Sequence, residues 1–400
     1  MFVIVTLLLD VLGVGIMIPV LPRLIADFHG GDLSQGASSF GLVMAVYTLM
    51  LFVFSPVQGT LSDQLGRKPL LFVSLSGTAV CYWLLWQAPS LSWVFAAQII
   101  NGISGASMTV CSACIADVTP PQERAKSFGL IGATFGVGLI LGPALGGALS
   151  AFGLHVPFIF AMVLALVDLA YGIAVLPETL APENRRPFSW SRGNPVAALR
   201  LLTRSRTLMG LSTLLVFTML GLQCLRATWV LYTTHRFHWS TAQNGWTFAL
   251  IGVFAAALQG GGLRVFIRRF GELATLLASL ALGALSYVLF GMATGNALMY
   301  VGIPLSCCAN LAVPVVQGLA SQEVDESEQG RLQGALAGLT TLCTTLGTLG
   351  ATRVLAWSTA ADASGIPEGT VFFVGAALFV VAFALALTSM PRRTQINAAS

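Results

Sequence analysis

The sequence predicts an all-α membrane protein with twelve transmembrane helices, arranged as two halves of six. The composition predicts the class, because 56% of the 400 residues are hydrophobic and only 9% are charged. A soluble domain carries about 25% charged residues, so this chain lacks the polar surface that it would need to face water. Its apolar segments also repeatedly exceed the ~18 residues that indicate a membrane-spanning helix.

Twelve apolar segments, separated by charged residues or by prolines and glycines, predict the positions of the spans. The first six lie near residues 2–25, 38–60, 69–87, 92–115, 124–150 and 156–176. The other six lie near residues 207–233, 243–266, 272–293, 297–320, 329–355 and 370–390. The first segment is too long and too poor in upstream charge to be a cleaved signal peptide. An even number of spans places both termini on one side of the membrane.

Lysines and arginines predict the orientation of the spans. They gather in alternate connections and in the C-terminal tail, at Arg67, Lys68, Arg124, Lys126, Arg264, Arg268, Arg269, Arg392 and Arg393. By the positive-inside rule, these connections and both termini are cytoplasmic, and the net charge of +4 reflects topology rather than nucleic-acid binding. A basic polar insert, residues 177–206, separates residues 1–176 from 207–400. Two six-helix halves joined by such a linker are typical of secondary transporters built from repeats.

A compact group of charges lies between the second and third spans, in the stretch GTLSDQLGRKPL at residues 59–70. Asp63 and Arg67 are four residues apart, so they can pair with each other or with a neighbouring helix. An exposed pair contributes at most ~1 kcal/mol, which suits a contact that forms and breaks as the halves move. We expect Asp63, Arg67 and Lys68 to gate the cytoplasmic face, although Arg67 and Lys68 also fit a simpler role as topology anchors.

Glycines recur at four-residue steps in the fifth predicted span. Gly138, Gly142 and Gly146 form one bare helix face, and Pro143 adds a bend. Bare faces of this kind allow helix backbones to approach closely inside a membrane. The sequence therefore predicts that these four residues pack against another helix.

These motifs resemble those of a known family. GTLSDQLGRKPL resembles the loop signature of the major facilitator superfamily, and GPALGG at residues 142–147 resembles the antiporter signature of its drug exporters. Longer segments are similar to the tetracycline/proton antiporters, namely LLLDVLGVGIMIPVLPRL, IADVTPPQERAKSFGLIGATFGVGLILGP, WVLYTTHRFHWS and VPVVQGLASQEVDESEQGRLQG. The resemblance covers nearly the whole chain. It implies the major facilitator fold and proton-coupled efflux of a small amphipathic aromatic compound, with a tetracycline-type drug as the leading candidate.

The chain also departs from the tetracycline exporters. The resemblance leads us to expect acidic residues in the third and ninth spans, where this sequence has Cys81 and Leu282. In the fourth span, Gln98 stands where the family motif usually has an arginine. With fewer carboxylates, the cavity would be less negative. We therefore expect a cargo that is neutral, zwitterionic or weakly anionic, with weak or no transport of metal-chelated tetracycline.

Three ionisable residues lie at membrane depth, Asp10, Asp168 and Arg226. Each costs at least ~2.5–3.5 kcal/mol to insert, so each is a candidate functional residue. Asp10 lies in a family-like stretch, and we expect it to couple transport to protons; a structural role as a hydrogen-bonded helix contact is the alternative. Asp168 and Arg226 are a candidate buried charge pair, which can be functional or merely static.

Four amide side chains within the second set of spans are candidate substrate ligands, Gln223, Gln259, Asn310 and Gln317. A few polar groups in an apolar cavity are typical of a small-molecule site. Any one of them can instead form a hydrogen bond between helices. Gln317 is the strongest candidate, because it lies within a family-like segment.

Other functional classes find little support in the sequence. All seven cysteines, including the pair Cys111 and Cys114, lie in apolar segments, and the four histidines lie at span ends or in loops. Neither H-E-x-x-H nor G-x-S-x-G occurs, so we expect no enzyme, no metal site and no cofactor. The family resemblance implies a bacterial inner-membrane location and activity as a monomer. The runner-up function is an exporter or facilitator of another hydrophobic drug or metabolite, without tetracycline activity.

Overall fold

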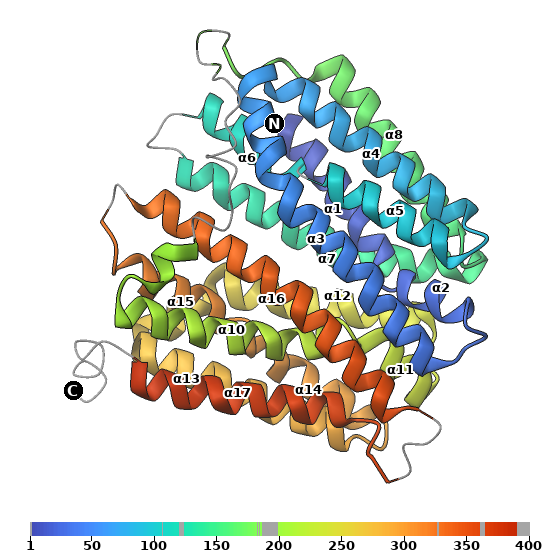
Figure 1. Ribbon diagram of the computed structural model, residues 1–400, viewed down its shortest axis with the longest axis vertical. Helices are drawn as coiled ribbons and strands as arrows, with labels where there is room; N and C mark the ends of the chain where they lie inside the picture. Colours follow the sequence, from blue (N-terminus) through green and yellow to red (C-terminus); the bar gives the residue numbers. More distant parts are fainter. Residues whose placement is uncertain are drawn as a thin grey trace. The chain divides into compact units, whose positions relative to one another are not determined.

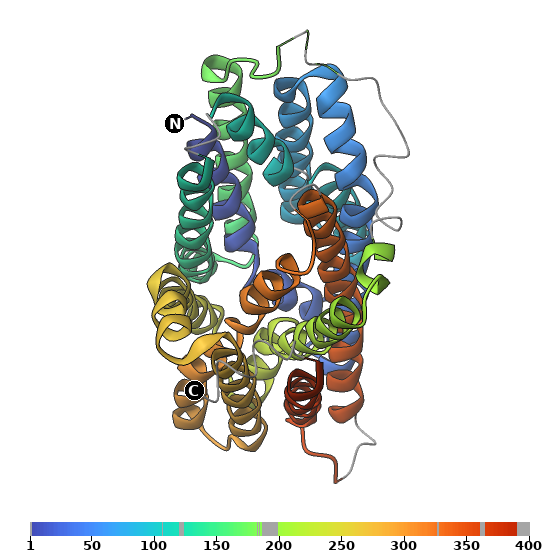
Figure 2. The same ribbon diagram turned by 90° about the vertical axis from the view of Figure 1, so that its left-hand side faces the viewer.

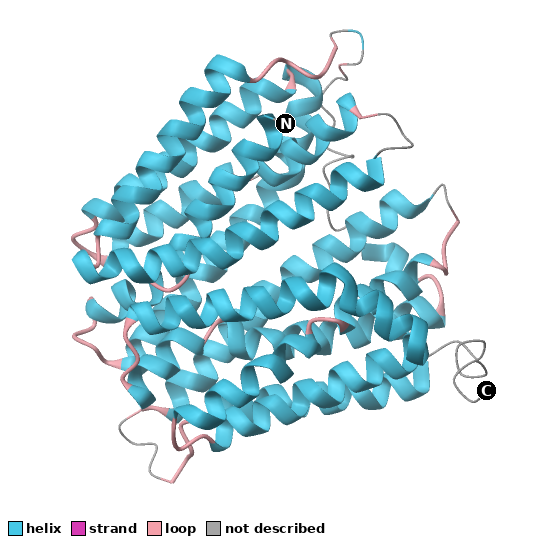
Figure 3. Ribbon diagram, turned by 180° about the vertical axis from the view of Figure 1, so that it is seen from behind, coloured by secondary structure: helices cyan, strands magenta, loops and turns pink. Residues whose placement is uncertain are grey.

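The structure is a computed structural model that describes residues 2–105, 107–119, 124–181, 183, 185, 199–325, 328–360 and 365–389. Within these ranges every regular element is a helix and no strand is present (Figure 3). A helix is what an apolar chain needs in a bilayer, because it satisfies the backbone hydrogen bonds within the segment itself. The predicted all-α class is confirmed.

The predicted N-terminal half is helical throughout its described length, apart from short connections. They are α1 (Phe2–Met17), α2 (Leu21–Asp27), α3 (Leu33–Leu65), α4 (Arg67–Gln87), α5 (Leu91–Ser104), α6 (Ser107–Val118), α7 (Arg124–Leu149), the short η2 (Ser150–Phe152) and α8 (Val156–Val175). Both α3 and α7 contain an internal proline, Pro56 and Pro143 respectively.

The predicted C-terminal half is also built of helices joined by short connections. Its helices are η4 (Arg200–Thr203), α10 (Arg206–Arg226), α11 (Trp229–Phe237), α12 (Thr241–Ala257), η5 (Leu258–Gly262), α13 (Leu263–Met292), α14 (Asn296–Ala309), α15 (Ala312–Ser321), α16 (Gln329–Ser358) and α17 (Thr370–Ser389). The predicted eighth and ninth spans are joined by helix rather than by a loop. Their boundary is a kink at Gly271, whose φ of 82° is left-handed.

Eleven helical segments of the described chain are long and apolar enough to cross a membrane. One of them, Thr241–Met292, has 52 residues, which is more than twice the ~20 that one crossing requires. Counted as two crossings, this segment brings the number to the twelve spans that the sequence predicts.

The chain forms two compact units. The first contains Met1–Gly31, Leu42–Asn194 and Trp239–Gly252, and the second contains Asp32–Gly41, Pro195–His238 and Val253–Ser400. Much of the predicted linker, including residues 186–198, lies outside the described residues. The division into residues 1–176, 177–206 and 207–400 therefore stays a prediction.

Close backbone contact holds the first unit together. Helix α1 packs against α7 and α8, and α4 packs against α5 and α8 (Figure 2). Gly142 of α7 faces Gly15 of α1 so closely that neither position has room for a Cβ atom. Gly138 likewise faces Val11, and Gly146 faces the backbone of Ile16. The bare face that the sequence predicts for α7 thus lies on α1.

Aromatic rings fill the core of the second unit, where α10 runs beside α17 (Figures 1 and 2). The Trp229 and Phe290 ring centroids are 5.3 Å apart, and those of Tyr287 and Phe379 are 5.1 Å apart. Both pairs meet edge to face, which is a favourable geometry for aromatic rings. Tyr287 is 1% exposed, so these rings form a packed wall that ties α11, α13 and α17 together.

Four spans are interrupted within the predicted membrane segments. The interruptions are α1/α2 at residues 18–20, α5/α6 beginning at Gly105, α10/α11 at residues 227–228, and α14/α15 at residues 310–311. They fall on the first, fourth, seventh and tenth predicted spans, one in every three. Unwound backbone at membrane depth is tolerated where it lines a cavity, and in transporters it marks the places where cargo and ions bind.

Candidate functional site

The charged junction between α3 and α4 is built around Gly66. Its φ of 110° is left-handed, a conformation that glycine adopts without strain, and a Cβ atom there would clash with the Glu178 carboxylate. Glu178 Oε1 accepts a hydrogen bond from the backbone N–H of Arg67 at 2.9 Å, and Oε2 accepts one from Lys68 at 3.2 Å. The carboxylate therefore lies at the positive N-terminal end of α4.

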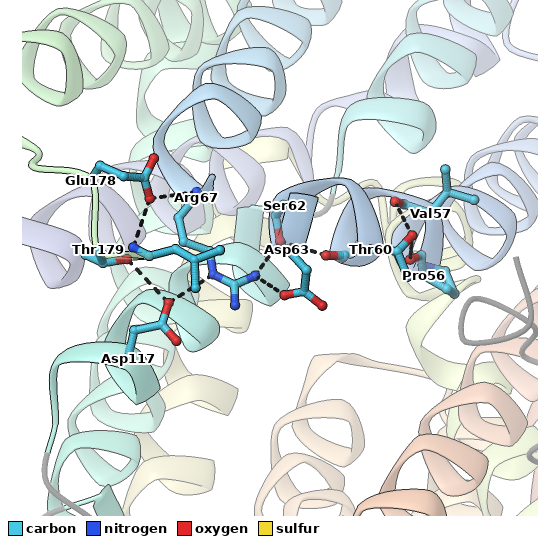
Figure 4. A network of polar contacts seen from close by, with 11 residues as sticks. Pro56, Val57, Thr60, Ser62, Asp63, Arg67, Asp117, Glu178 and Thr179 are labelled. Carbon is cyan, nitrogen blue, oxygen red and sulfur yellow. Dashed lines mark hydrogen bonds and ion pairs between the residues drawn. The ribbon is translucent and has the colours of Figure 1, made fainter. Parts of the chain in front are cut away.

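The Arg67 guanidinium binds three side chains at this junction (Figure 4). Its Nη1 lies 2.7 Å from Asp63 Oδ1 and donates to Ser62 Oγ at 2.6 Å. Its Nε donates to Asp117 Oδ2 at 3.0 Å. Arg67 is 8% exposed, so both ion pairs are partly shielded from water and stronger than a surface pair.

Lys68 lies apart from this network. Its Nζ donates to the backbone carbonyl of Ile173 at 3.3 Å and lies 5.5 Å from the centre of the Phe72 ring. The structure thus brings Asp63 and Arg67 together as the sequence predicts, and adds Asp117. The gating role of all three predicted residues stays a prediction.

A cavity of about 500 Å³ opens beside the junction. It is lined by Asp63, Arg67, Asp117, Thr179, Leu180, Glu183 and Arg185. Burial alone would raise the pKa of Glu178, but hydrogen bonds from the backbone N–H groups of Leu180, Arg67 and Lys68, together with the charge of Arg185, lower it overall. Glu178 therefore stays ionised and holds the start of α4.

Asp10 lies near the middle of the first span, on α1. Its Oδ2 accepts a hydrogen bond of 2.6 Å from Ser107 Oγ, and Ser107 is the first residue of α6. The Asp10 carboxyl group thus lies beside the α5/α6 break. Because Asp10 is only half-buried, its side chain is still partly accessible to solvent.

Asp168, on α8, is in the same unit and is buried more completely. It is 1% exposed, and neither carboxylate oxygen has a hydrogen-bond partner within the described chain. The Thr6 hydroxyl oxygen, in the same unit, is likewise buried without a hydrogen-bond partner in the described chain. Asp168 belongs to the first unit and Arg226 to the second, so the predicted pair of these two residues stays a prediction.

In the second unit, Arg226 is the last residue of α10 and directly precedes the α10/α11 break. Its Nη2 donates to Asn310 Oδ1 at 2.7 Å, and Asn310 lies in the α14/α15 break. Two interrupted spans are thus joined by one charge-assisted hydrogen bond.

The other candidate substrate ligands have different surroundings. Gln223 is 5% exposed and donates to Thr348 Oγ1 at 2.9 Å, which ties α10 to α16. Gln259 is exposed within η5, a π-helical turn, and Gln317 is partly exposed on α15. Their roles as substrate ligands stay predictions.

Sequence reasoning missed Asp117, Glu178 and Ser107. A signal for two of them exists, because Asp117 and Glu178 each follow an apolar span on the same predicted face as Arg67. Ser107 carries no comparable signal, since it is a small polar residue in a long apolar segment.

Comparison with known proteins gives a consistent result. The profile of the Major Facilitator Superfamily matches residues 3–352. The class C tetracycline resistance protein of Escherichia coli is 37% identical over 94% of this chain and 93% of its own. The class H protein of Pasteurella multocida is 33% identical over 93% and 92%.

Solved structures show the same fold. The human organic anion transporter MFSD10 (TETRAN) is 27% identical and covers 96% of this chain and 98% of its own, with a TM-score of 0.69. The nucleoside transporter NupG is 15% identical over 97% and 98%, with a TM-score of 0.77, a likeness that concerns the fold alone. This chain therefore belongs to the major facilitator superfamily and, within it, to the group of the tetracycline resistance proteins.

Proposed function

We propose that this chain is a proton-coupled efflux transporter for a small amphipathic aromatic compound, with a tetracycline-type drug as the leading cargo. The observation that carries the proposal is the half-buried Asp10 carboxylate, bound to Ser107 at a helix break. A carboxylate at membrane depth is neutralised when it takes up a proton, so its protonation can accompany movement of the protein. The tetracycline resistance proteins, at 33–37% identity, supply the cargo class.

The Arg67 network acts as the cytoplasmic gate in this proposal. Arg67 joins the end of α3 to α6 through Asp63 and Asp117, so a rearrangement of these helices must break at least one ion pair. The Asp63 side chain is 41% exposed, so water can replace its ion pair with Arg67 during a transport cycle.

We propose an inner-membrane location, as the family implies, and the charge bias of the connections supports cytoplasmic termini and a cytoplasmic 177–206 linker. We propose that the protein works as a monomer, exchanges cargo for protons and performs no catalysis. Cysteines introduced into the linker should resist a membrane-impermeant thiol reagent in intact cells, and ready labelling would contradict this topology.

Expression in a bacterial host that lacks its own exporters tests the function. The wild-type chain should raise the inhibitory concentration of tetracycline and lower the drug accumulated in the cells, and a protonophore should reverse both effects. Normal accumulation despite abundant protein in the membrane would reject tetracycline as cargo. Efflux that survives the protonophore would reject proton coupling.

A second candidate is export of an aromatic organic anion without tetracycline activity. Arg226 favours it, because a cation at membrane depth attracts negative cargo, and the similar structure of MFSD10 carries the name of an organic anion transporter. The same host, challenged with a panel of aromatic acids, separates the two candidates.

A further inference from the structure

Arg226 carries a charge that no described residue of the second unit neutralises. It ends α10 in the middle of the seventh predicted span, yet its side chain is exposed. Among the ion pairs of the described residues, none includes Arg226. A guanidinium stays charged in proteins, and at membrane depth it needs a counter-charge or polar partners.

The one hydrogen bond that the guanidinium makes within the described chain orients it. Asn310 Oδ1 accepts from Nη2 at 2.7 Å, and the Asn310 amide in turn donates to the Ser306 carbonyl at 3.4 Å. Asn310 is thus fixed on its own helix and holds one arm of the guanidinium. A guanidinium has five N–H donors, so the others remain for a ligand.

An aromatic wall lies beside this pair. The Tyr287 hydroxyl donates to the backbone carbonyl of Leu222 at 3.4 Å, and Leu222 lies four residues before Arg226 on α10. The ring packs edge to face on Phe379. A planar cation next to an apolar aromatic surface matches an aromatic ligand that carries an oxygen anion, because the guanidinium fork pairs with two oxygens at once.

We propose that Arg226, oriented by Asn310, binds the enolate or carboxylate group of an aromatic cargo, and that the cargo is carried free of metal. The inference deepens the proposed function, on which it rests. A chelated metal would occupy the same oxygens and add positive charge beside the guanidinium. The Arg226–Asn310 site thereby selects the metal-free form.

Equilibrium binding to the purified full-length chain tests this site. The probe is tetracycline, followed by its fluorescence, once with EDTA and once with excess Mg²⁺. The wild-type protein should bind the metal-free probe more tightly than the magnesium-loaded one. Arg226→Gln should weaken binding of the metal-free probe by about tenfold to hundredfold, the range for a charge-assisted hydrogen bond, and should remove the preference for the metal-free form.

Two further variants separate ligand binding from structure. Asn310→Asp places a carboxylate against Arg226, so it should occupy the guanidinium and weaken probe binding while raising thermal stability; a merely structural pair would show only the gain in stability. Arg236→Gln is the matched control, because Arg236 pairs with Glu368 at 3.5 Å and lies outside the site. Its affinity should equal that of the wild type.

Two results would overturn the inference. One is unchanged affinity for metal-free tetracycline in a folded Arg226→Gln variant, and the other is tighter binding of the magnesium complex by the wild type. Should the wild type bind no tetracycline at all, the proposed cargo fails, and 2-naphthoate becomes the probe. Binding of 2-naphthoate that depends on Arg226 then supports the site, and binding that does not, or no binding, rejects it.

Discussion

Each of the two units has a charged side chain that is hydrogen-bonded at a helix break, and the charge is negative in the first unit and positive in the second. In the first unit, the α5/α6 break supplies Ser107, which binds the Asp10 carboxylate. In the second unit, the α10/α11 break follows Arg226, which is bound by Asn310 from the α14/α15 break. The cores differ as well, since glycines bring α1 and α7 together in the first unit and aromatic rings fill the second.

The difference in charge implies a difference in role. A carboxyl group at membrane depth can be neutralised by a proton, whereas a guanidinium stays charged. We therefore expect Asp10 to alternate between two protonation states, and we propose that Arg226 receives its counter-charge from a ligand. We accordingly propose that the first unit binds the coupling proton and that the second unit binds the cargo.

The largest expected effect comes from Asp10. Asp10→Asn should abolish accumulation of tetracycline against its gradient in proteoliposomes driven only by a pH gradient, because the amide cannot take up a proton. Exchange of drug at equilibrium should persist. The control Ser107→Ala removes only a hydrogen bond, worth ~1 kcal/mol, and should retain coupling. Uphill transport by Asp10→Asn would remove the proton role from the first unit.

The Arg67 network should give the next largest effect. Asp63→Asn and Asp117→Asn should each lower the transport rate by roughly tenfold, since each replaces an ion pair to Arg67 with a neutral contact. Asp117 should be at least as sensitive, because its side chain is 22% exposed and that of Asp63 is 41% exposed. Transport assays at matched membrane abundance measure this effect.

Lys68→Gln provides the control for that network. Among the described residues, the Lys68 ammonium group contacts a backbone carbonyl and a ring and forms no ion pair, so its loss should cost much less. Equal losses in all three variants would contradict the account, because they would show that the two ion pairs of Arg67 matter no more than the Lys68 contacts.

Substitution of Asp168 should change transport less than substitution of Asp10, the other membrane-depth acid of the first unit. Asp168 is 1% exposed and has no hydrogen-bond partner in the described chain, so ionisation there would be costly. Asp168→Asn is isosteric with the neutral acid and should keep transport within about twofold of the wild type, a ~0.4 kcal/mol change. A shifted pH profile of transport in this variant would show that Asp168 also carries a proton.

The smallest effect concerns Glu178. Because the pKa of its carboxyl group is lowered on folding, ionised Glu178 stabilises the fold at neutral pH, and this contribution is lost as the pH falls through the lowered pKa. Glu178→Gln should therefore reduce stability by less than ~1 kcal/mol at pH 7, the range for a charge at a helix N-terminus. The gap between wild type and variant should close in acid. Thermal unfolding in detergent at several pH values measures it, and a gap that widens in acid would contradict this account.

Much of the fold could be predicted from the chain alone. Charge depletion and the length of the apolar segments gave the helical membrane class and, with one long segment counted twice, the twelve spans. The pairing of Asp63 with Arg67 also followed from a four-residue spacing. These features are local, so periodicity and composition report them directly.

The sites depended on contacts between residues that are distant along the chain. Ser107 meets Asp10 across 97 residues, and Asp117 meets Arg67 across 50. The residues that neighbour Asp10 and Asp117 in the sequence do not indicate which side chain each acid binds. The four candidate amides also cannot be told apart by sequence, because all lie in apolar segments; they are Gln223, Gln259, Asn310 and Gln317. Only the folded unit shows that Gln223 is bound to Thr348 while Asn310 orients a guanidinium.

The sequence by itself determined that the chain crosses a membrane many times and carries rare charges at depth, because the bilayer excludes unpaired charge and unsatisfied backbone regardless of detailed packing. The tertiary structure decided where the spans break and which partner each charge meets. A helix break needs neighbouring helices to satisfy the freed backbone groups, and those neighbours come from distant parts of the chain. For that reason only the three-dimensional structure shows that both units place a charged side chain beside a helix break. The side chain is the Asp10 carboxylate in the first unit and the Arg226 guanidinium in the second.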